Sequence, residues 1–83
     1  MRIEDNFKSN LNKLIRRNPD LERAFKETID AVIRNPLTMG KRSKVPSNSR
    51  HIGVKSHWVL WWRVEGNIIT MLACGHHDDF FRR

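Results

Sequence analysis

The chain has 83 residues, enough for one domain with a modest core, and 16 Lys and Arg against nine Asp and Glu give it a net charge of +7. Its single cysteine, Cys74, excludes an internal disulfide framework and indicates a reducing compartment. The longest apolar run, Trp58–Trp62, is too short to span a bilayer, and the N-terminus has no apolar leader core. These features predict one cytoplasmic domain over residues 1–83 with a polyanionic partner and no membrane association.

The first half of the chain predicts two helices joined by a short turn. Asn18 can cap the second helix, Pro19 suits its first position, and Pro36 ends it, because the residue before a proline avoids the α region. So short a connection predicts a helical hairpin. The two apolar stripes at helical spacing are Phe7, Leu11, Leu14 and Ile15, followed by Leu21, Phe25, Ile29, Val32 and Ile33. Residues 1–3 could add a brief strand before them.

The second half predicts a long basic loop over residues 37–49 and then a small sheet. We expect strands at Arg50–Val54, Trp58–Val64 and Ile68–Cys74, with Glu65-Gly66-Asn67 as the turn between the last two. Large apolar residues on both faces of 58–64 place that strand centrally, with helices over at least one side. The predicted fold is α+β, with an N-terminal helical hairpin packed on a small antiparallel β-sheet.

Positive charge is concentrated in this second half. Residues 1–40 carry eight basic and six acidic residues, whereas residues 41–83 carry eight basic and only three acidic residues. No acid occurs from Lys41 to Val64, a distribution typical of an electrostatic face that binds phosphates. The candidate RNA-binding cations are Lys41, Arg42, Lys44, Lys55, Arg63 and Arg82.

All four histidines lie in the basic half: His51, His57, His76 and His77. Histidine exchanges protons near neutral pH, and guanidinium groups such as that of Arg50 can stabilise charge on a phosphorane. This combination suits metal-independent RNA cleavage, in which the 2′-OH attacks the adjacent phosphate and a second group protonates the leaving 5′ oxygen. The plainer alternative is that these histidines are polar surface residues. The sequence supports neither a zinc site nor a Ser/His/Asp hydrolase, and we expect no metal or other cofactor.

The aromatic residues divide between core and possible base-stacking positions. Trp58, Trp61 and Trp62 are more typical of core positions in a strand. Of Phe80 and Phe81, one is expected to anchor the tail to the core and the other to stack on a base of single-stranded RNA.

The order of elements, the aromatic strand Trp58–Val64 and the tail Gly75–Arg82 resemble the RelE/ParE superfamily of type II toxins, within it the RelE-like and YafQ-like ribonucleases. The strand is similar to the family's aromatic-x-Leu-x-Tyr strand, and the tail to its Gly-x-His-x-Asp/Glu ending with an aromatic residue. The resemblance covers nearly the whole chain. It implies an mRNA interferase that cuts mRNA in the ribosomal A site and is inhibited by a partner antitoxin.

The resemblance also implies roles for individual residues. His77 corresponds to the tail histidine of acid–base catalysis, and His51 is similar to an upstream catalytic histidine. His57 stands where YafQ-like members have an acidic residue, Arg50 where many members carry an arginine, and Phe81 at the terminal aromatic position. Three departures are that the chain has no tyrosine, that Ala73 and Cys74 stand where many active members carry an arginine, and that Val59 replaces an arginine of one version of the strand.

Two hypotheses follow. The first is a ribosome-dependent endoribonuclease with His77, His51, His57 and Arg50 at the catalytic site. The second is a gyrase-directed, ParE-like or catalytically inactive binding protein with the same architecture. Both predict a cognate antitoxin with an acidic, amphipathic segment. The first also requires that the histidines of the tail and the guanidinium groups of the strands share one pocket.

Overall fold

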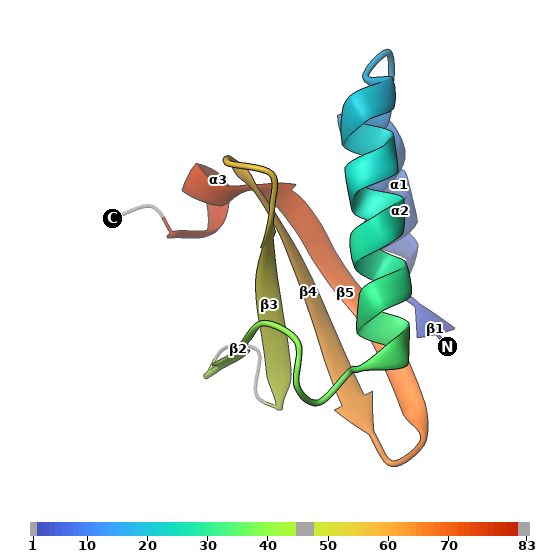
Figure 1. Ribbon diagram of the computed structural model, residues 1–83, viewed down its shortest axis with the longest axis vertical. Helices are drawn as coiled ribbons and strands as arrows, with labels where there is room; N and C mark the ends of the chain where they lie inside the picture. The colour runs from blue at the N-terminus through green and yellow to red at the C-terminus, as the bar shows by residue number, and fades with distance from the viewer. Residues whose placement is uncertain (1, 45–47, 82–83) are drawn as a thin grey trace.

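The computed structural model describes residues 2–44 and 48–81 and shows a small α+β domain with a mixed five-stranded sheet (Figure 1). Two long helices lie on one side of the sheet and a short third helix lies near its far end. The helices are α1 (Asp5–Ile15), α2 (Pro19–Arg34) and α3 (His77–Phe81). The strands are β1 (Arg2–Ile3), β2 (Lys41–Ser43), β3 (Ser49–Val54), β4 (Trp58–Glu65) and β5 (Ile68–His76).

Local signals determine where the first two helices begin and end. The Asn18 side chain accepts a hydrogen bond from the Leu21 amide at 3.2 Å, and Pro19 occupies the first turn of α2. The Asn35 amide donates to the Ala31 carbonyl at 3.0 Å, and Pro36 follows the end of the helix. Within the predicted apolar stripes, Ile33 is the exception, because it remains 42% exposed.

The sheet has the order β1-β5-β4-β3-β2, so the predicted aromatic strand β4 is central. Strands β3 to β5 pair antiparallel as expected, and β2 pairs antiparallel to β3, but β1 pairs parallel to β5, with Arg2 opposite Thr70 and Ile3 opposite Met71. The prediction of a wholly antiparallel sheet is therefore wrong. The chain enters α1 directly from β1, and α1 packs along β5, which fixes the direction in which β1 runs.

The prediction of an uninterrupted basic loop over residues 37–49 is also wrong, because residues 41–43 form the edge strand β2. Its cationic residues have weak strand propensity, yet Lys and Arg are the residues that edge strands commonly carry. The chain approaches β3 tightly at Gly40, whose φ is +65°, and a Cβ there would lie 2.2 Å from the His51 carbonyl oxygen. Residues 45–47 of the expected loop lie outside the described residues.

A β-bulge in β5 changes which side chains face the helices. Trp61 pairs with Ala73 and Trp62 pairs with Met71, so Leu72 is an extra residue in β5. As a result Met71 enters the core beneath the helices, while Ala73 and Gly75 lie on the opposite face of the sheet beside Trp61 and Val59. We call this second face, which α1 and α2 do not cover, the open face.

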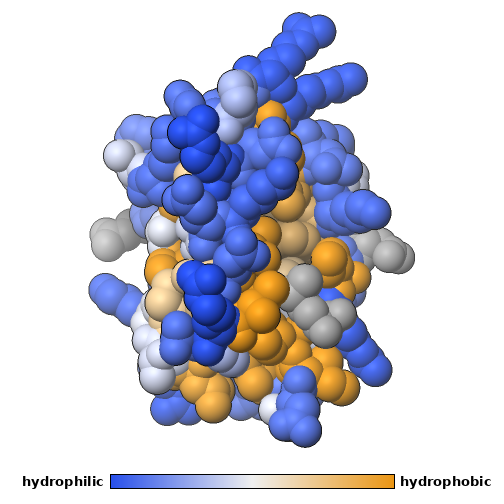
Figure 2. Space-filling view, turned by 45° about the vertical axis from the view of Figure 1, so that its right-hand side comes forward, coloured by the Kyte–Doolittle hydropathy of each residue, from blue (hydrophilic) through white to orange (hydrophobic). Residues whose placement is uncertain are grey.

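The core lies between α1, α2 and the covered face of the sheet. Trp62 is fully buried there and donates from Nε1 to the Pro36 carbonyl at 2.9 Å, which fastens the segment after α2 to β4. The other buried members are Phe7, Leu21, Phe25, Val32, Val54, Leu60, Met71 and Cys74. On the helix side of the molecule, an apolar band runs beside a column of hydrophilic side chains (Figure 2). Among the described residues, none of the helices has the length and apolar character needed to cross a membrane.

Candidate functional site

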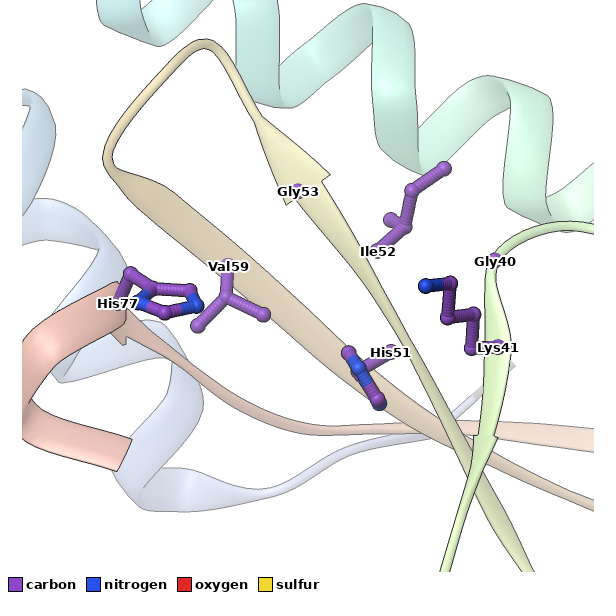
Figure 3. Close-up of a pocket in the computed structure, with 7 residues that line it drawn as sticks. All are labelled: Gly40, Lys41, His51, Ile52, Gly53, Val59 and His77. Atoms are coloured by element: carbon purple, nitrogen blue, oxygen red, sulfur yellow. The ribbon is translucent and has the colours of Figure 1, made fainter. Parts of the chain in front are cut away.

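His51 and His77 line the same pocket, although 25 residues separate them in the sequence. The pocket has a volume of about 480 Å³ and lies at the β2–β3 side of the open face. Lys41 supplies a positive charge at its wall, and Figure 3 shows the two histidines on either side of Val59. The remaining lining residues are Gly40, Ile52 and Gly53. We call this the histidine pocket.

Strand register and two hydrogen bonds position the His51 ring. His51 stands opposite Lys41 of β2 on one side and Trp61 of β4 on the other, so all three side chains share the open face. The Ser43 Oγ lies 2.5 Å from His51 Nδ1, and Trp61 Nε1 donates to the same Oγ at 3.0 Å. The rings of His51 and Trp61 have centroids 5.0 Å apart. Ser43 and Trp61 therefore restrain the orientation of the imidazole.

The environment of His51 favours its neutral form. Burial lowers the pKa of His51 below its ordinary value of 6.5, and the positive charges of Lys41 and His77 lower it further. At neutral pH the ring is therefore uncharged and able to accept a proton, which is the state that a general base requires.

His77 reaches the pocket because the tail turns into α3, a helix that the sequence patterns above do not predict. The His77 amide donates to the His57 carbonyl at 2.6 Å, which fixes the start of α3 beside the β3–β4 turn. The Phe80 ring packs on the Trp61 ring with centroids 4.7 Å apart. Phe80 also occupies the space above Gly75, where a Cβ would come within 2.7 Å of its Cε2. Phe80 is thus the phenylalanine that anchors the tail, as expected of one of the pair.

His57 does not line the histidine pocket. Its ring stacks on that of His76 with centroids 5.8 Å apart and an interplanar angle of 7°, at the end of the sheet from which α3 starts. His76 Nδ1 accepts from the Asp78 amide at 3.2 Å. Within residues 2–44 and 48–81, the structure has no group of three or more His, Cys, Asp or Glu side chains that could hold a metal ion.

Arg50 also lies outside the histidine pocket. It lines a second pocket of about 210 Å³ together with Arg42, and its Nε and Nη2 donate to the carbonyls of Met39 and Gly40 at 2.8 and 3.1 Å. Its position follows from strand geometry, because neighbouring residues of β3 face opposite sides of the sheet. The requirement that the tail histidines and the strand guanidinium groups share one pocket is therefore not met: His77 and His51 line the pocket, but His76 and the guanidinium group of Arg50 do not. Lys41 supplies the positive charge in place of Arg50.

The other predicted RNA-binding residues are dispersed. Arg63 lies on the open face, opposite Ser49, but not at the histidine pocket. Lys44 is exposed just after β2, and Lys55 is exposed in the turn between β3 and β4. Arg82 and the side chain of Phe81 lie outside what the structure describes.

Two residues of the site, Ser43 and Gly75, were missed as functional candidates. Ser43 lies in the segment expected to be a loop, and only its alternation with Lys41 on a strand would have placed it beside His51. Gly75 stands just before the tail histidines, where a residue without Cβ leaves room for an aromatic ring. That position is the one sequence signal that could have revealed the docking of the tail.

Comparisons with known proteins do not identify the chain. A scan against models of protein families finds no match, and no curated protein matches it in sequence.

Proposed function

We propose that the protein is a metal-independent endoribonuclease that uses His51 and His77 for proton transfer. The observation that carries this proposal is the histidine pocket, which is lined by one imidazole from β3, one from the start of α3, and Lys41. Two groups able to give and take protons, placed across one pocket with a cation, are the minimum that 2′-OH attack on a phosphodiester requires.

The lowered pKa of His51 suits it to the role of the base, which leaves the role of the acid to His77. His51, held neutral, takes the proton from the 2′-OH, and the 2′ oxygen forms a bond to phosphorus as the bond from phosphorus to the 5′ oxygen breaks. His77 acts as the general acid and donates a proton to that leaving 5′ oxygen, and Lys41 stabilises the extra negative charge on the phosphorane. The products are a 2′,3′-cyclic phosphate and a 5′-OH end. Ser43 acts here as a positioning residue for His51.

The role of His51 as a base requires one particular tautomer. The Ser43 hydroxyl has two lone pairs, so it can accept from both Trp61 Nε1 and His51 Nδ1. In that arrangement the proton of neutral His51 resides on Nδ1, and Nε2 carries the lone pair that accepts the substrate proton.

We further propose that the domain has the RelE/ParE-like arrangement and acts as the toxin of a type II toxin–antitoxin system, cutting mRNA on the ribosome. The support is the resemblance of the aromatic strand and of the tail, together with a cationic second half. An acidic, amphipathic antitoxin segment suits the apolar band on the helix side (Figure 2) and the positive charge.

Inducible expression tests this function with a matched pair of histidine variants. His77→Gln removes the tail histidine of the pocket, whereas His76→Gln removes its neighbour, which stacks on His57 outside the pocket. We expect the parent and His76→Gln to arrest growth and produce new mRNA 5′ ends in primer extension, and His77→Gln to do neither. Growth arrest by His77→Gln with intact mRNA would refute the ribonuclease.

One observation favours the second candidate, a gyrase-directed or catalytically inactive binding protein. Among the described residues, no arginine lines the histidine pocket. This candidate predicts inhibition of DNA supercoiling, or binding alone, with mRNA intact in every variant.

A further inference from the structure

The second pocket carries an inference of its own. Arg42 of β2 and Arg50 of β3 are directly opposite each other in the strand register, and both line this pocket. Like charges at directly opposite positions of two strands destabilise the pair unless a counter-charge lies between them. The chain has no acidic residue from Lys41 to Val64, and among the described residues neither arginine forms an ion pair with a carboxylate. A ligand with negative charge would relieve the repulsion.

The site is fixed in place before any ligand arrives. Two of the five N–H donors of Arg50 bind the carbonyls of Met39 and Gly40, which holds the guanidinium plane against the segment that leads into β2. Gly40 is itself restrained by its close approach to β3. An anion at this pocket therefore meets a guanidinium whose side-chain entropy has largely been lost on folding.

The lining of the pocket favours a phosphate group. The polar residues Ser43, Asn48 and Ser49 line the pocket together with the two arginines, while Leu37 and Val64 contribute apolar surface. The planar fork of arginine matches the oxygens of a phosphate and binds them in pairs. Apolar wall beside a phosphate site suits a nucleotide, which presents sugar and base next to its charge.

The position of this pocket relates it to the histidine pocket. Lys41 and Arg42 are neighbours on the edge strand β2, and their side chains face opposite sides of the sheet. A single RNA strand that crosses the β2 edge can therefore place one phosphate at the histidines and another between the two arginines.

From these observations we infer that Arg42 and Arg50 form a second phosphate subsite, which binds a flanking phosphodiester of single-stranded RNA away from the bond that is cut. This inference rests on the proposed ribonuclease function for its substrate, but it concerns binding and not proton transfer.

The test measures binding of the full chain to an oligonucleotide that cannot be cleaved. The probe is a single-stranded RNA with 2′-O-methyl groups throughout, titrated by fluorescence anisotropy at several salt concentrations. Arg42→Gln should weaken binding by about tenfold or more, the value for loss of a charged hydrogen bond. It should also reduce the slope of log K against log salt by about 0.7, the share of one phosphate contact in a single strand.

A matched control removes the same charge elsewhere. Arg16 is exposed in the connection between α1 and α2, away from β2 in Figure 1, so Arg16→Gln should change affinity far less than Arg42→Gln. Arg42→Lys retains the charge but not the fork, and it should restore the salt slope while recovering only part of the affinity.

Several results would overturn the inference. One is an Arg42→Gln protein that binds the probe as Arg16→Gln does. Another is a loss of affinity for polyglutamate in Arg42→Gln that equals its loss of affinity for the RNA probe, which would assign the pocket to an acidic protein. The two proposals can fail separately. If the parent cleaves RNA but Arg42→Gln binds the probe as well as Arg16→Gln does, the ribonuclease proposal stands and the subsite is refuted. If the parent never cleaves RNA but Arg42→Gln selectively loses affinity for the probe, the subsite stands and the ribonuclease proposal is refuted.

Discussion

Replacing Gly75 with alanine should undock the tail helix and displace His77. The added Cβ would lie 2.7 Å from Phe80 Cε2, where ordinary contact begins at 3.4 Å, so the ring must retreat by about 0.7 Å (3.4 − 2.7) or the strand must distort. Overpacking that is absorbed by a buried core costs about 1–3 kcal/mol. Phe80, however, is 41% exposed on a five-residue helix, and its pairing with Trp61 is worth only about 0.5–1.5 kcal/mol. Release of the Phe80 ring therefore costs less free energy than distortion of the strand.

Urea titration and NMR distinguish release of the Phe80 ring from distortion of the strand. We expect Gly75→Ala to lower the free energy of unfolding by about 1 kcal/mol in urea titrations, the cost of losing the Phe80–Trp61 contact. The NMR signals of Trp61 and His77 should shift, and RNA cleavage should fall by far more than the small loss of stability explains. Phe80→Ala should have much the same effect, and the double variant should be no worse than either single variant.

Gly53 provides the matched control on the same face. A Cβ there would meet only the Trp58 carbonyl oxygen, at an ordinary 3.9 Å, so Gly53→Ala should leave the α3 signals in place. Unchanged α3 signals in Gly75→Ala, or fully additive effects in the double variant, would refute the docking argument.

Three further predictions concern the interior of the site and the core. Ser43→Ala removes the hydroxyl that contacts both His51 and Trp61, so it should cost about 0.5–1.5 kcal/mol in urea titrations and change the tautomer ratio of His51 in 15N NMR; a tautomer ratio equal to that of the parent would contradict its positioning role. Because burial and nearby charges lower the pKa of His51 below 6.5, the unfolded chain takes up this proton first as the pH falls. The free energy of unfolding should therefore decline as the pH falls from about 6.5 through the lower pKa of the folded state, and it should decline less in His51→Gln. Urea midpoints that fall equally in the two proteins across this range would count against the lowered pKa. Burial raises the pKa of Cys74 to about 12, so iodoacetamide should label its thiol only on unfolding, with a urea midpoint equal to that from tryptophan fluorescence; rapid labelling of the native protein would show that Cys74 is accessible.

Elements defined by local signals could be predicted from the sequence. The second helix begins at an asparagine cap followed by proline and ends before Pro36, and the positions of the last three strands follow from apolar alternation and a Gly-Asn turn. A brief strand at residues 1–3 was expected, but its parallel pairing with β5 and the edge strand β2 could not be predicted, because each depends on a partner distant in the sequence. The extra residue at Leu72 likewise depends on how β5 meets β4.

The site could be predicted only in part for the same reasons. His51 and His77 were both among the predicted catalytic residues, although their presence at one pocket depends on α3 and on the space above Gly75. The grouping of Arg50 with His51 was avoidable, since adjacent residues of a strand point to opposite faces. Applied to β3, that rule separates the two side chains and directs attention to Lys41, which stands across from His51.

The most direct test of proton transfer by the two histidines is cleavage of an RNA on the ribosome with one 2′-O-methyl group placed at the nucleotide before the cut. The account predicts that the parent protein cuts the unmodified RNA, leaves a 2′,3′-cyclic phosphate, and fails at the modified linkage. It also predicts that His51→Gln and His77→Gln each abolish cutting of the unmodified RNA. Cutting at the methylated linkage, or full activity in either variant, would contradict it.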